Sequence, residues 1–142
     1  MSGQLPGAGA ADIEAIEAVN SELYAAFEAG DLDRMAAVWD DERPDDVVCI
    51  HPGWDAVRGR DRVLRSWAAI MANTAFIQFV LTDVQTTVLA DIAVVTCVEN
   101  IVTTMEELDR NARIVTTNLF HRSGSGWRLR LHHGSPVLAG KG

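Results

Sequence analysis

The sequence has little basic charge. Its 142 residues include twelve Lys and Arg against twenty Asp and Glu, which gives a formal net charge of −8. An acidic chain repels the phosphate backbone unless its basic residues form a concentrated stripe. The densest basic group, Arg122 with Arg128 and Arg130, is too small for such a stripe. The composition therefore argues against nucleic acid as a partner.

Long apolar runs and paired cysteines are also missing. No apolar run approaches the ~20 residues of a membrane-spanning helix. Residues 1–11 contain no Lys or Arg and no long apolar stretch, so we do not expect a secretory signal there. Cys49 and Cys97 lie in apolar, strand-like runs without a paired-cysteine motif. We expect two buried thiols rather than a disulfide, in a cytoplasmic protein without a membrane partner.

A chain of this length predicts one domain. The Gly-, Pro- and Ala-rich residues 1–11 and the short segment 138–142 are predicted to be flexible tails on either side of a domain at 12–137. Apolar residues recur at helical spacing over 12–29, and Gly30 is expected to end that helix. Asp31 is expected to cap a second helix that contains Trp39, and residues 60–73 predict a third.

The second half of the chain has the pattern of strands. Residues 47–51, 76–89, 92–104, 112–122 and 127–137 are rich in β-branched and aromatic residues, with hairpin turns at 90–91 and 123–126. This order predicts an α+β fold in which the helices cover one face of a curved antiparallel sheet.

Strand alternation then assigns side chains to the two faces of the sheet. With regular pairing, Thr82 lies opposite Glu99, Thr116 lies opposite His133, and Asn118 lies on the same inner face. A carboxylate on the inner face is costly to desolvate unless it is paired, hydrogen-bonded or protonated. This inward polar group is the most informative feature of the pattern.

Several segments resemble the SnoaL-like branch of the nuclear transport factor 2-like superfamily. They are Cys49-Ile50-His51-Pro52-Gly53-Trp54, Arg58-Gly59-Arg60-Asp61, Ser66-Trp67, Val94 through Asn100, Thr117-Asn118-Leu119-Phe120, and Trp127 through Pro136. The resemblance covers residues 12–137. It implies a cone-shaped curved sheet packed on three N-terminal helices, with a pocket at its open end. The superfamily includes ketosteroid isomerase, scytalone dehydratase, limonene epoxide hydrolase and polyketide cyclases, and also non-catalytic association modules.

The catalytic sets of those enzymes are not found at matching positions. The isomerase pairs a tyrosine with an aspartate, and the only tyrosine here is Tyr24, on the first predicted helix. The Arg/Asp/Asp set of the epoxide hydrolase is also missing. The fold therefore raises the expectation of a small-molecule pocket without naming its chemistry.

Glu99 is the candidate general base, because an apolar setting weakens the acidity of a carboxyl group. His133 is a candidate proton shuttle, assisted by Asn118, and His51 precedes Pro52-Gly53 where a pocket rim is expected. The alternative is that Glu99 and His133 form a satisfied buried pair that serves stability alone.

The remaining ligand-binding candidates are aromatic: Tyr24, Trp39, Trp54, Trp67 and Phe120. Aromatic residues at helical or strand spacing are more often plain core, but Trp54 lies in a glycine-containing loop. No metal site is expected, because His132 and His133 are adjacent in one strand and point to opposite faces.

The residues and the resemblance together predict a cofactor-free isomerase, dehydratase or cyclase that acts on an apolar carbonyl- or hydroxyl-bearing metabolite. The alternative is a non-catalytic ligand-binding or association module. The outer sheet face mixes apolar and charged residues, among them Leu119 and Arg128, and this pattern suits a two-fold interface. A homodimer through that face is expected.

Overall fold

The computed structural model describes residues 8–105 and 108–138. Its helices are α1 (Ala8–Ala29), α2 (Leu32–Val38), the short 3-10 helix η1 (Pro44–Asp46) and α3 (Arg60–Ala72). Gly30 follows α1 at a φ of 63°, and the Asp31 carboxylate caps α2 by accepting a hydrogen bond from the Arg34 amide at 3.1 Å. Because α1 begins at Ala8, the segment 8–11 is helix rather than tail. Residues 1–7 and 139–142 of the two predicted tails lie outside the described residues.

The strands form one sheet with the order β2-β1-β6-β5-β4-β3. They are β1 (Val48–Ile50), β2 (Val57–Arg58), β3 (Phe76–Leu89), β4 (Ile92–Met105), β5 (Leu108–Ser123) and β6 (Gly126–Pro136). Strands β3 to β6 pair antiparallel as predicted, whereas β1 runs parallel to β6. Strand β2 was not predicted, because two residues are too short for a periodic signal. The α+β architecture is confirmed.

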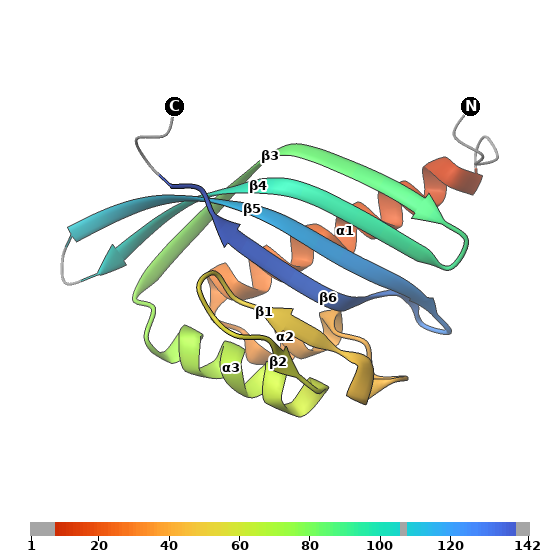
Figure 1. Ribbon diagram of the computed structural model, residues 1–142, viewed down its shortest axis with the longest axis horizontal. Coiled ribbons are helices and arrows are strands. Elements are labelled where there is room, and N and C mark those ends of the chain that lie inside the picture. The colour runs from red at the N-terminus through yellow and green to blue at the C-terminus, as the bar shows by residue number, and fades with distance from the viewer. Residues whose placement is uncertain (1–7, 106–107, 139–142) are drawn as a thin grey trace.

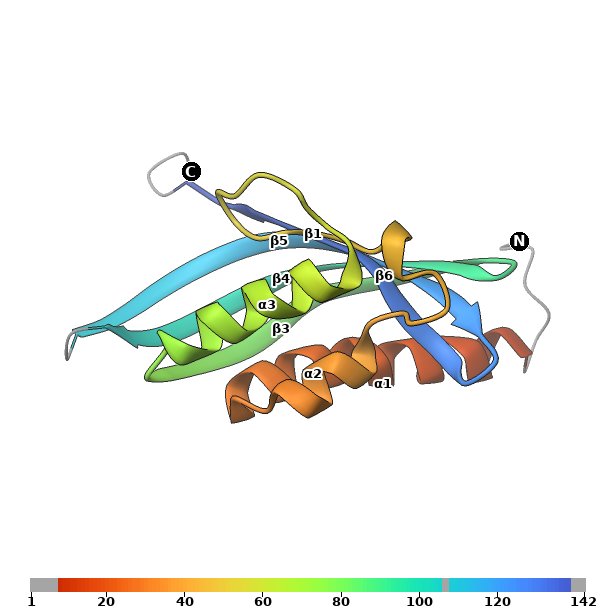
Figure 2. The ribbon, with the colours of Figure 1, turned by 90° about the horizontal axis from the view of Figure 1, so that it is seen from below.

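The helices lie together on the concave side of the curved sheet (Figures 1 and 2). The core fills the space between these two layers, and its largest fully buried apolar side chains are Ile16, Leu23, Met35, Trp39, Val47, Val63, Val95, Phe120 and Leu129. Burying each such side chain contributes roughly 1.5–3 kcal/mol. The packing of helices on the sheet is therefore the main source of stability.

A β-bulge in β6 changes which histidine faces the helices. Phe120 pairs with Leu129 but Leu119 pairs with Leu131, so Arg130 is the extra residue of the bulge. Asn118 therefore lies opposite His132, which is buried, and His133 is exposed on the outer face. The prediction that His133 faces inward was wrong.

A second bulge lies in β3. Glu99 pairs with Leu81 rather than with Thr82 as predicted, and the register shifts between Thr82 and Gln85. Asp83, inside this segment, has a φ of 52°. Before the bulge, Phe79 and Leu81 therefore pack against the core, and Ile77 lies on the same face. The inward position of Glu99 itself was predicted correctly, since only 4% of its surface is exposed.

Both cysteines are buried free thiols, as expected. In the part of the chain that the structure describes, no helix is long and apolar enough to cross a membrane.

Candidate functional site

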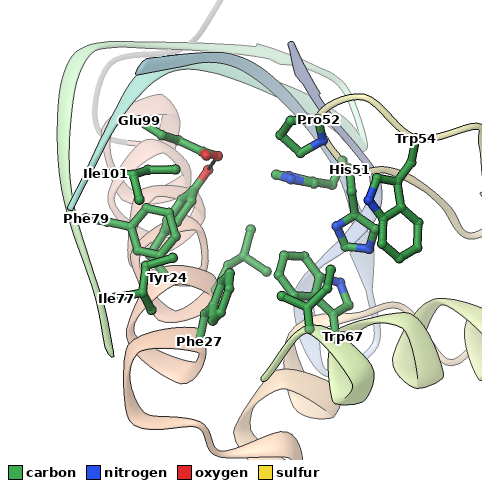
Figure 3. A pocket seen from close by; sticks show the side chains of 13 residues that line it. Tyr24, Phe27, His51, Pro52, Trp54, Trp67, Ile77, Phe79, Glu99 and Ile101 are labelled. Atoms are coloured by element: carbon green, nitrogen blue, oxygen red, sulfur yellow. Dashed lines mark hydrogen bonds between the residues drawn. The ribbon is translucent and has the colours of Figure 1, made fainter. Parts of the chain in front are cut away.

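A cavity of about 250 Å³ lies between the helices and the concave face of the sheet. Most of its lining is apolar or aromatic: Leu23, Tyr24, Phe27, Pro52, Trp54, Trp67, Ile70, Ile77, Phe79 and Ile101. The polar lining residues are Glu99, His51 and His132. Figure 3 shows Glu99, Tyr24 and Phe79 on one wall and His51, Trp54 and Trp67 on the other.

Each wall of the cavity comes from a different part of the fold. Helix α1 brings Tyr24 and Phe27, strands β3 and β4 bring Phe79 and Glu99, and β6 brings His132. The loop after β1 carries His51, whose ring packs edge-on against Trp54 and Trp67 with centroids 4.7 Å apart in both cases. Trp54 is 47% exposed and therefore forms part of the rim.

Glu99 is held by two hydroxyl groups that reach the same oxygen. The Tyr24 hydroxyl donates to Oε2 at 2.6 Å, and the Thr116 hydroxyl donates to the same atom at 2.8 Å. Burial raises the pKa of Glu99, and the two hydrogen bonds oppose that shift. Burial also raises the pKa of Tyr24, with the neighbouring Glu99 as a further cause. Desolvation thus favours the neutral carboxyl, the state in which Glu99 can donate a proton.

A series of side-chain hydrogen bonds through Tyr24 and Asn118 links Glu99 to His132. Asn118 donates from Nδ2 to the Tyr24 hydroxyl at 3.3 Å and to Oδ1 of Asn20 at 2.8 Å. Its Oδ1 lies 2.6 Å from Nδ1 of His132. Both Asn118 and Asn20 are almost fully buried, so these bonds satisfy polar groups that water does not reach.

The two cavity histidines are neutral at physiological pH. Burial lowers the pKa of His51 to about 4. Burial also lowers the pKa of His132, to about 3, with His51 and His133 as smaller causes. His51 bonds Ser66 through Nε2 at 2.8 Å, and the Ser66 hydroxyl donates its own proton to the Val63 carbonyl at 2.6 Å. His51 therefore carries its proton on Nε2.

Eight of the nine predicted site residues divide into three groups. Glu99, Tyr24, His51, Trp54 and Trp67 line the cavity. Asn118 lies behind the lining and holds its polar groups. Trp39 and Phe120 are fully buried core residues outside the lining, which agrees with the alternative weighed for such aromatics.

The ninth candidate, His133, also lies outside this site, since it is exposed on the outer sheet face. His132 occupies the position that was predicted for it. Sequence reasoning also missed Phe27, Ile77, Phe79 and Ile101 as lining residues. The position of Phe79 depends on the bulge at Asp83, whereas Phe27 follows Tyr24 on the buried side of α1 and helical spacing could have indicated it.

Among the described residues, no group of three or more His, Cys, Asp or Glu could hold a metal ion. The lining residues likewise include no Lys or Arg that could neutralise an anionic group. The chemistry available at this site is hydrogen bonding and proton transfer within an apolar cavity.

Residues 16–139 match the model of the SnoaL-like domain family. The chain belongs to that family. A solved structure from Streptomyces avermitilis, provisionally named a dehydratase of the nuclear transport factor 2-like family, is 43% identical with a TM-score of 0.87, covering 92% of this chain and 99% of that one. A provisionally named calcium/calmodulin-dependent protein kinase type II association domain from Thiobacillus denitrificans is 35% identical with a TM-score of 0.76, covering 86% and 94%.

A curated relative, F-box protein SKIP8 from Arabidopsis thaliana, is 28% identical over 128 residues, which are 90% of this chain. This SnoaL-like chain spans about half of that relative, 52% of its length. The similarity to these proteins agrees with the observed fold, and the relatives carry different names for their roles. The family alone therefore does not select a reaction.

Proposed function

We propose that this SnoaL-like protein is an enzyme that moves protons on a small apolar molecule without a cofactor. The observation that carries the proposal is Glu99, whose Oε2 is held by two hydroxyl donors while its Oε1 has no partner in the described part of the chain. A carboxyl group with a raised pKa inside an apolar cavity can exchange a proton with a bound ligand near neutral pH.

The reaction class is isomerisation, dehydration or cyclisation of a carbonyl- or hydroxyl-bearing metabolite. All three need a group that gives or takes a proton and a second polar group at the reacting atoms. His132 fills the second role in place of His133, and His51 with Trp54 shapes the mouth. The provisional dehydratase name of the Streptomyces avermitilis protein supports this class.

The alternative function is a non-catalytic ligand-binding or association module. Its support is the 35% identity with the Thiobacillus denitrificans protein named as a kinase association domain. In that case the Tyr24–Glu99–Thr116 hydrogen bonds serve stability alone. Both alternatives include a homodimer through the outer sheet face. Both also include a cytoplasmic location, and the two free buried thiols are the argument for that location.

The experiment is a thermal-shift screen of the purified protein against steroid-, polyketide- and terpenoid-like carbonyl and hydroxyl compounds, followed by turnover assays on the hits. A ligand present at 100 times its Kd stabilises the native state by about 2.7 kcal/mol. Glu99→Gln keeps the shape of the side chain and removes its proton exchange.

We expect hits that Glu99→Gln still binds but no longer converts. Full turnover by Glu99→Gln would refute the assignment of Glu99. Binding without turnover by either protein, for every hit, would favour the module.

A further inference from the structure

The hydroxyl groups of Tyr24 and Thr116 both donate to Oε2 of Glu99, and this fixes the other protons at the inner end of the cavity. A hydroxyl group has one proton, and that of Tyr24 goes to Oε2 of Glu99 at 2.6 Å. The 3.3 Å contact between Tyr24 and Asn118 must then be donated by the Asn118 amide. The same Nδ2 donates to Oδ1 of Asn20 at 2.8 Å, and this second bond fixes the orientation of the Asn118 amide.

The orientation of Asn118 decides the tautomer of His132. The oxygen of the Asn118 amide lies 2.6 Å from Nδ1 of His132, and a carbonyl oxygen can only accept a hydrogen bond. Nδ1 of His132 therefore carries the proton. Because the ring is neutral, its Nε2 is unprotonated and is a hydrogen-bond acceptor.

That acceptor is left for a ligand. His132 lines the cavity, whereas Asn118, on its Nδ1 side, does not, so the opposite edge of the ring faces the cavity. Within residues 8–105 and 108–138, Nε2 has no hydrogen-bond partner. The nearby hydroxyl protons of Tyr24 and Thr116 are already donated to Glu99. A ligand that brings its own hydroxyl donor can satisfy this acceptor of His132.

We propose that the cavity binds an uncharged, largely apolar molecule that carries a hydroxyl group and donates its proton to Nε2 of His132. Asn118 is the positioning residue for this contact. An anionic ligand is disfavoured, because the cavity is largely apolar and none of the residues that line it is a Lys or Arg. The inference rests on the proposed function, since it names the ligand class of the same cavity.

Glu99 can make a second hydrogen bond to the ligand, in which Glu99 is the donor. Its Oε2 already accepts two hydrogen bonds, so in the neutral carboxyl the proton lies on Oε1. A hydroxyl group can accept that proton as well as donate its own, whereas a ketone can only accept. The cavity therefore distinguishes an alcohol or phenol from a ketone of the same shape.

The first test is nitrogen-15 NMR of the histidine rings in the ligand-free protein at pH 7. We expect His132 to show a protonated Nδ1 and an unprotonated Nε2. Asn118→Leu removes the acceptor, and Asn20→Ala releases the Asn118 amide without touching His132. Both variants should lower the population of the Nδ1-protonated form. Asn73→Ala, which loses only a bond to the Ala69 carbonyl at the end of α3, is the control and should leave it unchanged.

The second test measures the binding of three probes, 2-naphthol, 2-methylnaphthalene and 2-naphthoate, by calorimetry. We expect 2-naphthol to bind about tenfold or more tightly than 2-methylnaphthalene, because the latter leaves a buried acceptor unsatisfied. This preference should shrink in Asn20→Ala and persist in Asn73→Ala, while 2-naphthoate should bind most weakly.

An Nε2-protonated His132 in the unmodified protein would overturn the inference. Equal affinity for 2-naphthol and 2-methylnaphthalene, a preference for 2-naphthoate, or no binding of any probe would overturn it as well. None of these measurements depends on turnover. A hydroxyl preference in a protein without enzymatic activity would refute the proposed reaction and leave the ligand class intact.

Discussion

The two buried histidines make the stability of the protein sensitive to acid. Burial lowers the pKa of His51 to about 4 and that of His132 to about 3, from an ordinary value of 6.5. Between these values the unfolded chain binds more protons than the native state. The free energy of unfolding therefore rises with pH across this window, and the contribution of the two neutral histidines is lost as the pH falls from 6.5 towards their native pKa values.

His132→Gln is expected to reduce the change of the free energy of unfolding with pH. A pKa difference of one unit corresponds to about 1.4 kcal/mol, so His132 should account for about 1–2 kcal/mol of the stability lost between pH 7 and pH 5. Urea unfolding at the two pH values measures the loss. His133→Gln on the exposed outer face is the matched control and should keep the full loss. An unchanged pH dependence in His132→Gln would contradict the burial argument.

At the scale of one element, the β3–β4 hairpin has a strained turn. Ala90 has a φ of 55°, a conformation that costs an alanine about 1 kcal/mol or more but is open to glycine. Ala90→Gly is therefore expected to raise the free energy of unfolding by about 0.5–1 kcal/mol, as measured by urea unfolding. The same substitution at exposed Ala112 inside strand β5 should lower it by a similar amount. A destabilised Ala90→Gly would mean that chain entropy outweighs the strain.

The helices and long strands could be predicted from the sequence, but the bulge in β6 could not. Hydrophobic periodicity predicted the three helices and the four long strands, because that signal is local. The faces of β6 beyond Leu129 depend on the bulge at Arg130, whose guanidinium pairs with the buried carboxylate of Asp40 at 2.8 Å. Asp40 also donates its amide to the Leu129 carbonyl. The Arg130–Asp40 ion pair joins residues 90 positions apart, so alternation along one strand could not reveal it.

The same dependence on contacts between distant residues explains which site residues were predicted and which were missed. Glu99 was predicted because β4 alternates regularly from its turn to that residue. His132 was missed because the bulge lies between it and the turn, and one extra residue moves every following side chain to the other face. The hydrogen-bonded chain from Asn20 to His132 spans α1, β5 and β6, so it follows only from the folded arrangement.

At the scale of the whole molecule, the outer face of the sheet is more apolar than a solvated face. An antiparallel sheet with one face in water normally alternates apolar and polar side chains. Here Val80, Val102 and Val115 are 57%, 38% and 49% exposed. On the same outer face, Val94 pairs with Leu119, Leu119 pairs with Leu131, and Val98 pairs with Val115. These exposed and paired apolar residues lie on four neighbouring strands, which suits the proposed homodimer.

Val115→Lys tests the dimer. Because a two-fold axis places each residue in the interface twice, one substitution adds two unpaired cations to an apolar surface. We expect the dimer Kd to rise at least about 100-fold, so that analytical ultracentrifugation at micromolar concentration detects a monomer. Leu32→Lys is the control, since Leu32 is 39% exposed on helix α2, away from the outer sheet face, and should leave the dimer intact. A Val115→Lys protein that sediments as a dimer, or an unmodified protein that sediments as a monomer, would contradict the outer-face interface. A monomeric variant that keeps its affinity for 2-naphthol would further show that one chain alone forms the complete cavity.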